Sequence, residues 1–377
     1  MVVIGTRPEA IKMAPVLNGL RISSRVDTRL VFTGQHRRLV NDLQTVLDLV
    51  PDYDLSIMRE GQSLYDVGEG CLRGLSVIIQ EYKPDMILVQ GDTATAFFSS
   101  LAAFFEGVSV GHVESGLRTK KKSMPFPEEM FRRLTDVITD LHFAPTIQAK
   151  ENLKKEGLDP DQIYVTGNTV VDSLLKIADL EGELDDDILR VISQDEGSRL
   201  VLLTAHRRES FGEPLRRIFR AARRLTDKHR DVQLLYPMHP NPNVVEPARE
   251  LLGDHPRIHL VDPLPYQDMI SVLRGSVLIL TDSGGIQEEA PTFGVPVLLL
   301  REETERPEGL DIGIVRLVGT NEEAIVTEGS RVLEEDRTRE HTTVNPFGDG
   351  RAGERISDII VAHLTNSSRS TTDWPGP

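Results

Sequence analysis

Short apolar runs alternate along this chain with longer amphipathic stretches such as Ala10–Ile22 and Leu215–His229. The runs form an early and a late series: Val2–Ile4, Arg29–Thr33, Met86–Gln90, Ser109–Val113 and Ile163–Thr166, then Leu200–Ala205, Val232–Pro237, Ile258–Val261, Val277–Thr281 and Val295–Leu300. Alternating strands and helices predict parallel sheets with helices on both faces. The sequence therefore predicts an α/β protein with two doubly wound, Rossmann-like domains, and a single barrel is the less favoured alternative.

A polar, acidic stretch at Glu181–Asp187 lies between the two series and marks the region where the domains join. A chain of 377 residues is also too long for one ordinary core. We expect a first domain over residues 1–168 and a second over residues 169–347. Residues 365–377 have no periodicity, so they are expected to form a disordered tail.

The composition limits the partners and the compartment. The net charge of −16 disfavours nucleic acid and anionic membranes, although a local basic cluster can still bind an anionic ligand. No stretch approaches the ~20 apolar residues of a membrane helix, and no signal peptide is apparent after Met1. Cys71 is the one cysteine, which excludes an internal disulfide. We therefore expect a cytoplasmic protein that binds neither nucleic acid nor membrane.

The sharpest motif is LTDSGGIQEEAPTFG at residues 280–294, which ends an apolar strand and opens a helix. Gly284 and Gly285 allow a ligand to approach the backbone closely, and Ser283 and the free N–H groups of a helix start favour phosphate. Glu289, about one turn further on, is suited to accept hydrogen bonds from ribose hydroxyls. An ordinary N-cap and tight turn with solvated glutamates explains this loop alone equally well.

Basic side chains follow several other predicted strands. Arg7 and Lys12 lie in GTRPEAIKMAP after the first strand, and His206 and His239 follow strands of the second series. Arg306 follows a further strand end. Because ligands of open α/β sheets bind at the carboxyl ends of the strands, these cations suit a diphosphate that leaves as an anion. For each of them taken alone, a solvated or structural role is the usual one.

Three carboxylates in the first half also follow strand ends or open a helix. Asp92 comes after the strand that ends at Gln90, Glu114 after the next strand, and Glu128 in a proline-punctuated loop. Close carboxylates push their pKa values apart, so one can serve as a base and another as an acid. Any one of them could instead be an N-cap or an ion-pair partner, and Asp92 in particular could cap a helix that starts at Thr93.

The sequence predicts no metal site and no redox cofactor. It contains no HExxH and no paired CxxC, and its histidines are scattered through unrelated loops. No GxGxxG follows the first strand, which argues against a bound dinucleotide. The chemistry is therefore expected to come from side chains alone.

Long motifs occur in a fixed order along the chain: GTRPEAIKMAPV, TGQH, VQGDTAT, GHVESGLRT, PFPEE, VTGNTVVD, TAHRRES, LTDSGGIQEEAP, TERPEG and NPFGDG. Together they resemble the non-hydrolysing UDP-N-acetylglucosamine 2-epimerases of bacteria and archaea. The resemblance runs from residue 1 to about residue 360, and so many long motifs in register make it highly specific.

The resemblance implies a glycosyltransferase-B-like fold, in which a UDP-sugar binds in the cleft between two Rossmann-like domains. A C-terminal helix over residues 348–364 would complete the first domain. The resemblance also implies a homodimer, without metal or redox cofactor, that interconverts UDP-GlcNAc and UDP-ManNAc for surface polysaccharides. The expected reaction eliminates UDP and adds it back, because C2 has no adjacent carbonyl that could stabilise a carbanion.

The resemblance also assigns roles to individual residues. The first domain would supply the catalytic carboxylates Asp92, Glu114 and Glu128. It would also direct three basic residues toward the ligand: Arg7, Lys12 and Arg132. In the second domain His206 would stabilise the departing diphosphate, and the other substrate contacts would come from this set: His239, Ser283, Gly284, Gly285, Arg306 and, at the ribose, Glu289.

The chain departs from the family pattern in several places. Phe131 stands where the family usually has Asn, and the loss of the amide groups leaves an altered sugar pocket open as an alternative. Ser115 and Ser210 replace the usual Ala and Asn. The loops at Gln35–Arg38 and Gly61–Gln62 also differ, so activation by a second substrate molecule is not predicted.

Four other functions stay open at this point: epimerisation of a modified UDP-N-acetylamino sugar, glycosyl transfer, hydrolysing epimerisation and non-catalytic nucleotide-sugar sensing. Glycosyl transfer does not need three carboxylates in the first domain. Hydrolysing epimerases often carry a fused kinase domain, which this sequence lacks. A sensor would not need Asp92, Glu114, Glu128 and His206 to be intact.

Overall fold

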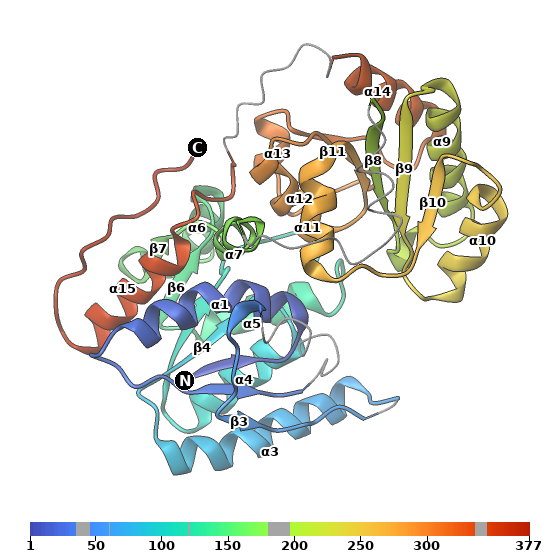
Figure 1. Ribbon diagram of the computed structural model, residues 1–377. Coiled ribbons are helices and arrows are strands. Elements are labelled where there is room, and N and C mark those ends of the chain that lie inside the picture. The colour runs from blue at the N-terminus through green and yellow to red at the C-terminus, as the bar shows by residue number, and fades with distance from the viewer. Residues whose placement is uncertain (35–45, 60, 120, 180–196, 336–344) are drawn as a thin grey trace. The chain divides into compact units, whose positions relative to one another are not determined.

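The computed structural model describes residues 1–34, 46–59, 61–119, 121–179, 197–335 and 345–377. The chain divides into two compact units, one made of Met1–Ser173 with Phe347–Pro377 and the other of Leu174–Pro346. Each unit contains one parallel sheet with helices on its faces (Figure 1). The predicted α/β class with two doubly wound sheets is confirmed. The division falls within α7 (Thr169–Ala178), close to the predicted boundary after residue 168.

The first unit contains a seven-stranded sheet in the order β3-β2-β1-β4-β5-β6-β7. The chain fills one side of β1 with β2 and β3 and then returns to fill the other side, so β1 and β4 meet at a topological switch point. The strands are β1 Val2–Ile4, β2 Leu30–Phe32, β3 Tyr53–Asp54, β4 Met86–Gln90, β5 Ser109–Val113, β6 Leu141–Ala144 and β7 Ile163–Val165. The helices of this unit are α1 Arg7–Ile22, α3 Leu64–Tyr82, α4 Ala94–Phe105, α5 Glu128–Ile138, α6 Ile147–Lys155, η1 Pro160–Gln162 and α15 Ala352–Leu364.

The second unit contains a six-stranded sheet in the order β10-β9-β8-β11-β12-β13, with its switch point between β8 and β11. Its strands are β8 Arg199–Thr204, β9 Val232–Pro237, β10 Ile258–Val261, β11 Ser276–Thr281, β12 Val297–Leu299 and β13 Val315–Leu317. Its helices are η2 Arg208–Ser210, α9 Glu213–Lys228, α10 Pro242–Leu252, α11 Tyr266–Gly275, α12 Gly284–Glu289, η3 Ala290–Phe293, α13 Glu308–Asp311 and α14 Glu322–Glu335.

Apolar side chains at strand and helix spacing form the cores. Every residue of β4 is buried, as expected of a central strand covered on both faces. On α9, Leu215, Ile218, Ala222 and Leu225 recur every three or four residues and are fully buried against the second sheet. This packing holds the strand ends, and the polar residues that follow them, in fixed positions.

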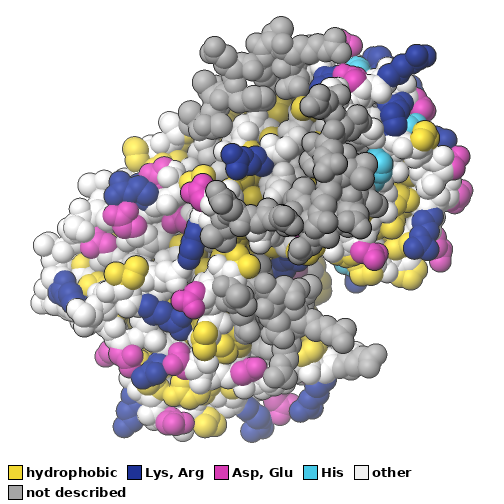
Figure 2. Space-filling model, viewed as in Figure 1, with side chains coloured by type: hydrophobic (Ala, Val, Ile, Leu, Met, Phe, Trp, Pro, Cys, Tyr) yellow, Lys and Arg dark blue, Asp and Glu magenta, His cyan; other side chains and the backbone are white. Residues whose placement is uncertain are grey.

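The surface carries both signs of charge. Arg224 pairs with Glu322 and Glu323 at 2.8 and 2.6 Å, and Arg331 pairs with Glu328 and Glu335 at 2.8 and 2.9 Å. On the face shown in Figure 2, Lys and Arg side chains lie among Asp and Glu side chains. Within the described part of the chain, no helix is long and apolar enough to cross a membrane.

Helix α15 packs against α1 in the first unit. The hydroxyl of Ser357 donates to the carbonyl of Val16 at 3.1 Å, and Gly353 lies so close to Pro15 that a Cβ would come within 2.6 Å of the proline ring. Asp172 accepts hydrogen bonds from the N–H groups of Gly353 and Ala352 at 2.7 and 3.2 Å, which caps α15. The C-terminal helix is therefore held by two helices of this unit.

The disordered tail predicted for residues 365–377 differs from what the structure shows. The N–H of Trp374 donates to the carbonyl of Val165 at 2.7 Å, and Asp373 accepts from the N–H of Val165 at 3.2 Å. Trp374 is only 5% exposed. Strand β7 is the edge of the sheet, and the tail pairs with backbone groups that a bare edge would leave open. Local periodicity could not reveal these contacts, because the partners are some two hundred residues away.

Candidate functional site

Two predicted carboxylates stand at neighbouring strand ends of the first sheet. Strands β4 and β5 are parallel, with Gln90 opposite Val113. Asp92 comes two residues after Gln90, and Glu114 comes directly after Val113, both at the carboxyl edge of the sheet. Ligands of open parallel sheets bind at this edge. The sequence-based expectation that these two residues lie close to the same edge agrees with this register.

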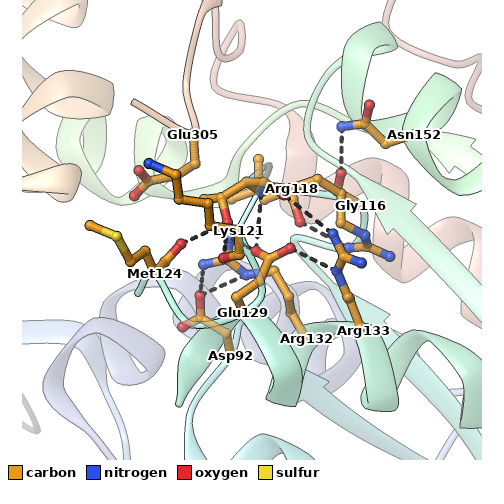
Figure 3. Close-up of polar contacts among 12 residues, drawn as sticks. Asp92, Gly116, Arg118, Lys121, Met124, Glu129, Arg132, Arg133, Asn152 and Glu305 are labelled. Carbon is orange, nitrogen blue, oxygen red and sulfur yellow. Dashed lines mark hydrogen bonds and ion pairs between the residues drawn. The ribbon is translucent and has the colours of Figure 1, made fainter. Parts of the chain in front are cut away.

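Arg132 of α5 holds Asp92. Its Nε donates to Asp92 Oδ2 at 3.1 Å, and its second terminal nitrogen makes a short ion pair with the same oxygen. A third nitrogen donates to Glu129 Oε2 at 3.1 Å. Figure 3 shows Arg132 directed toward both carboxylates. Arg132 is buried, whereas the Asp92 side chain is 30% exposed, so Asp92 is the member of this group that a ligand can reach.

Glu129 was not among the predicted site residues, although it organises α5. It is fully buried and also accepts from Arg133 Nε at 2.8 Å and from the N–H of Thr119 at 3.1 Å. Glu128, the predicted catalytic residue, is the first residue of α5 and is half-buried. The sequence feature that could have identified Glu129 is the position of two arginines, Arg132 and Arg133, three and four residues later. On a helix, side chains at this spacing meet.

Glu114 is fixed from two sides. It forms a short ion pair with Lys12 of α1, and its Oε2 accepts from Asn168 Nδ2 at 3.1 Å. The two charged side chains are each only 8% exposed. Glu114 also has a φ of 66°, a left-handed conformation that non-glycine residues rarely adopt and that costs about 1–3 kcal/mol. Such local strain is typical of functional sites. Asn168, in the VTGNTVVD motif, was not predicted as a site residue.

Glu9 ties the loop that carries Arg7 to the loop that follows β4. Its Oε2 accepts from the N–H groups of Gly5 and Thr6 at 3.0 and 2.6 Å, and its Oε1 accepts from the hydroxyl of Thr93 at 2.7 Å. Complete burial raises the pKa of Glu9 to about 7, although these hydrogen bonds oppose the shift. Arg7 itself is the first residue of α1 and is half-buried.

We expect stability to depend on the charge of Glu9. Its pKa rises from 4.5 to about 7 on folding, so the folded state binds the proton more tightly. Protonation of Glu9 therefore contributes about 3 kcal/mol to the free energy of unfolding below about pH 4.5. This contribution is lost as the pH rises through 7. The Glu9→Gln variant keeps the hydrogen bonds without the titration. Urea unfolding from about pH 5 to 8 should show the wild-type protein losing stability relative to the variant; parallel curves would contradict this.

In the second unit, Asp282 organises the residues that follow β8. Its Oδ2 accepts from the N–H groups of His206 and Arg207, both at 2.8 Å, and its Oδ1 lies 3.7 Å from His206 Nδ1. Partial burial lowers the pKa of His206, and Asp282 opposes that shift. Burial raises the pKa of Asp282. The sequence analysis missed Asp282, whose partners lie more than seventy residues away in the chain.

His206 and His239 lie against each other. Their ring centroids are 5.6 Å apart with an angle of 9° between the planes, which is a stacked arrangement. His239 Nδ1 accepts from the N–H of Asn241 at 3.2 Å, which leaves the other ring nitrogen as the N–H donor. The structure therefore brings these two predicted residues together at the ends of β8 and β9.

The SGG loop lies against two arginines. A Cβ at Gly284 would come within 2.9 Å of a terminal nitrogen of Arg306 and 3.5 Å of one of Arg207. Arg306 is fixed by Glu288, which accepts from its Nε at 2.5 Å, and by a short ion pair with Glu305. Guanidinium groups beside a glycine turn that opens a helix provide donors and positive charge for phosphate.

Ser283 and Glu289 complete the predicted set in this unit. Ser283 is the N-cap of α12, and its N–H donates to Thr281 Oγ1 at 2.9 Å. Glu289 Oε1 accepts from the hydroxyl of the buried Tyr266 at 3.2 Å. Gly285 has room for a Cβ, with Glu289 Oε1 as its nearest neighbour at 3.9 Å. Tyr266 orients Glu289 and was not predicted from the sequence.

Among the described residues, no group of three or more His, Cys, Asp or Glu side chains is arranged to hold a metal ion. The histidine pair in the second unit, His206 and His239, is stacked rather than convergent. Stacked rings direct their nitrogen lone pairs in the ring planes, so they do not meet at one point between the rings.

Phe131 packs on α4. Its ring stacks on Phe97 at 5.3 Å with an angle of 14° and meets the edge of Phe98 at 6.0 Å. It joins the apolar core of the first sheet as a partly buried residue. Its neighbour Arg132 points instead toward Asp92. In this structure the substitution of Phe for the usual Asn fills a contact between two helices.

We expect Phe131→Asn to lower stability and leave the reaction unchanged. Loss of the aromatic contacts should reduce the free energy of unfolding by about 2–4 kcal/mol. The turnover of UDP-GlcNAc should change by less than about threefold, because the ring packs on α4 and not on Asp92. Denaturant titration and proton NMR of the reaction measure both quantities. A more than tenfold change in turnover would show that Phe131 shapes the sugar pocket.

Two parallel sheets, each with polar residues at its carboxyl edge, define an enzyme-like α/β protein of the two-Rossmann-domain class. The fold matches that of a glycosyltransferase from Rickettsia africae with a TM-score of 0.61 at 15% identity, over 97% of this chain and 98% of that one. The match to a protein family is more specific than this match to the fold. A model described as UDP-N-acetylglucosamine 2-epimerase matches residues 18–361, and the chain belongs to that family.

Individual relatives agree with this assignment. A putative UDP-N-acetylglucosamine 2-epimerase of Thermotoga maritima is 48% identical over 95% of both chains. A structure of S. aureus MnaA with UDP has a TM-score of 0.91 and 42% identity over 99% of both chains. The Neisseria meningitidis UDP-GlcNAc 2-epimerase bound to UDP-GlcNAc has a TM-score of 0.88 and 40% identity, over 97% of this chain and 99% of that one. The resemblance inferred from the motifs is confirmed.

Proposed function

We propose that this protein interconverts UDP-GlcNAc and UDP-ManNAc by inverting C2 of the sugar. The observation that carries the proposal is the pair Asp92 and Glu114 at neighbouring strand ends, each held by a cation. Family membership and the UDP-GlcNAc bound to the Neisseria meningitidis relative name the substrate. No cofactor is required for this reaction.

The proposed route is elimination followed by addition. The C2 hydrogen is not acidic, because no carbonyl adjoins C2 to accept the electron pair. If the C2 proton moves to a carboxylate while the C1–O bond breaks, the electron pair of the C–H bond forms a C1=C2 double bond and UDP leaves with the electrons of the C–O bond. The products are 2-acetamidoglucal and UDP. UDP then attacks C1, and a carboxylic acid delivers a proton to the other face of C2.

The first unit supplies the proton-transfer groups in this proposal. Asp92, Glu114 and Glu128 act as acid and base on the two faces of the sugar. Each of the first two is held in place by an ion pair, with Arg132 for Asp92 and with Lys12 for Glu114. Three basic residues hold the reacting end of the substrate or its acids in place: Arg7, Lys12 and Arg132.

The second unit holds the leaving group. His206 donates to the departing diphosphate, and Arg306 adds positive charge beside the turn at Gly284. Ser283, Gly285 and His239 lie at the same sheet edge and contribute donors to the phosphates. Glu289, oriented by Tyr266, accepts from the ribose hydroxyls. Fixed donors aimed at a developing anion stabilise it without reorganisation, which is how the C1–O bond is made to break.

The experiment is proton NMR of the protein with UDP-GlcNAc in deuterium oxide, without added metal or NAD. We expect UDP-ManNAc to appear and deuterium to enter C2 of both sugars. Unchanged and unlabelled UDP-GlcNAc would contradict the proposal, and modified UDP-N-acetylamino sugars would then be tested. Release of free ManNAc and UDP would instead indicate hydrolysing epimerisation.

We also propose that the protein is a homodimer that pairs through the helices over the first sheet. Helices α3, α4 and α5 pack in a row. Phe104 and Phe105 at the end of α4 are 63% and 65% exposed, and Val137 of α5 is 76% exposed. Large apolar side chains exposed on neighbouring helices are suited to form a protein interface.

We expect Phe105→Asp to weaken this dimer by at least about tenfold, because a charge placed in an apolar contact must be desolvated. Sedimentation velocity of the variant at several concentrations measures the effect. Ile22→Asp, an exposed apolar residue on α1, is the matched control and should stay dimeric. A Phe105→Asp protein as dimeric as the wild type would show that this face is not the interface.

A further inference from the structure

A group of buried polar side chains lies directly behind Asp92 and Glu114, and the proposed mechanism does not use it. Its members are His112 of β5, Ser115, Arg118, Asp136 of α5 and His142 of β6, here called the buried network. The side chains of His112, Asp136 and His142 are no more than 1% exposed. Charged side chains are almost never buried so deeply unless they are paired. The contacts of these residues therefore indicate what the burial serves.

Asp136 is the centre of the buried network. Its Oδ1 accepts from His112 Nδ1 and from the hydroxyl of Ser115, both at 2.6 Å, and its Oδ2 accepts from Arg118 at 2.7 Å. Burial alone would raise the pKa of Asp136, but His112, His142 and Arg118 together hold it well below its usual range. Asp136 is therefore a carboxylate that can only accept hydrogen bonds.

The other ring nitrogen of His112 reaches the catalytic loop. His112 Nε2 lies 2.8 Å from the carbonyl oxygen of Gly91, which also can only accept. A carbonyl oxygen can only accept, so Nε2 donates to it, while Nδ1 lies 2.6 Å from Oδ1 of Asp136. The His112 ring thus clamps the carbonyl of the residue before Asp92 and is itself held by Asp136. Gly91 has a left-handed φ of 71°, so this clamp holds the turn that aims Asp92.

The same buried network reaches the second carboxylate and α5. Ser115 follows Glu114, whose own φ is 66°. Its hydroxyl donates to Asp136 and accepts from His142 Nδ1 at 3.0 Å. Asp136 lies one turn after Arg132 on α5, the helix that holds Asp92. The Asp136 carboxylate therefore connects the loops that follow β4 and β5 with α5, the helix whose Arg132 holds Asp92.

We propose that His112 and Asp136 are positioning residues, which fix the Gly91 carbonyl and α5 so that Asp92 meets C2 of the sugar in the geometry that proton transfer requires. The proposal rests on the role given to Asp92 above. A residue displaced by about 1 Å can lose about 100-fold in rate. The competing explanation is that the pair stabilises the fold only, as buried polar networks often do.

The test uses two neutral amides in place of His112. The Nε2 of Gln occupies the position of the ring Nε2 and can still donate to the Gly91 carbonyl, whereas the Nδ2 of Asn matches only the ring Nδ1. Both variants, His112→Gln and His112→Asn, replace the imidazole ring next to Asp136 by a neutral amide. They therefore share any loss of stability that arises from removal of the ring, and differ in the clamp on the loop.

We expect His112→Asn to lower kcat about 100-fold with KM and the affinity for UDP within about threefold. His112→Gln should recover most of that loss. Hydrogen exchange of the backbone over residues 90–96 should accelerate in the Asn variant and stay slow in the Gln variant. Thr139→Ala, which removes a buried hydroxyl at the end of α5 outside the buried network, is the control and should change kcat less than about threefold.

Equal kcat in the two His112 variants would overturn the proposal, as would equal exchange rates over residues 90–96. A loss of UDP affinity or melting temperature that matches the loss of kcat would show a role in the fold only. If the wild-type protein did not epimerise UDP-GlcNAc, the proposed function would fail by itself. The exchange rates of the two variants would then still decide whether His112 fixes the loop.

Discussion

Asp92→Asn and Glu114→Gln should each lower the rate of net epimerisation by about 10²–10⁴-fold, the range in which acid–base groups contribute. The amides keep the shape and the hydrogen bonds to Arg132, Lys12 and Asn168 but cannot take a proton. The conversion of UDP-GlcNAc to UDP-ManNAc, followed by proton NMR, measures the loss. The affinity for UDP should stay within about threefold, since the second unit is expected to bind it.

The two variants should also differ in how deuterium enters C2. If each carboxylate serves one face of the sugar, a variant that has lost one base still removes the proton from the epimer that presents the other face. In deuterium oxide, that variant should exchange the C2 hydrogen of one epimer for deuterium without converting UDP-GlcNAc to UDP-ManNAc. Asp27→Asn, an exposed carboxylate paired with Arg29, is the control and should behave as the wild type. Full net conversion by both site variants would show that neither group transfers the proton.

The fold and much of the site followed from local patterns. A parallel sheet places every strand end at one edge, so Asp92 after β4 and Glu114 after β5 could be placed together before their contacts were known. The same reasoning joined His206 with His239 and located the glycine turn at Gly284. These inferences need only the alternation of apolar strands with amphipathic helices and the shared direction of parallel strands.

The residues that the sequence did not reveal are those whose roles depend on distant partners. Asp282 was read as part of a glycine turn, yet its carboxylate holds the backbone of His206. His112 lies inside a strand and was not singled out, yet its ring contacts the Gly91 carbonyl. Trp374 lies in a polar tail and pairs with an edge strand. In each case the decisive neighbour is set by tertiary packing, which no local period encodes.

Phe131 is a position that a motif pointed to and whose packing the motif did not reveal. The comparison of motifs drew attention to it because an amide was missing, and an altered sugar pocket was kept open on that ground. The structure turns its ring toward Phe97 and Phe98 on α4. These two residues lie outside the quoted motifs, so the motif comparison could not show that Phe131 is one part of an aromatic contact. A departure from a family motif therefore indicates that the environment of that residue has changed. Only the direction of its side chain on the helix shows which neighbours it now contacts.

Gly284→Ala should weaken the binding of UDP by about 10- to 100-fold, which corresponds to one charged hydrogen bond of about 1.5–3 kcal/mol. The new Cβ would lie 2.9 Å from a terminal nitrogen of Arg306 and 3.3 Å from its Cζ. Arg306 has little room to retreat, because Glu288 and Glu305 hold it from the other side. The guanidinium, or the turn that carries Gly284, must therefore shift. Isothermal titration with UDP measures the loss.

Gly285→Ala separates this cause from a general disturbance of the loop. A Cβ there would have its nearest protein atom at 3.9 Å, an ordinary contact. The Gly285 variant should therefore keep the melting temperature of the wild type, whereas Gly284→Ala should lose about 1–3 kcal/mol of stability through the forced contact. If Gly284→Ala bound UDP as tightly as the wild type and was equally stable, the close approach of Arg306 would not matter for the phosphate site. If both variants lost stability equally, the loop would be sensitive to any side chain, and the specific contact with Arg306 would not explain the effect.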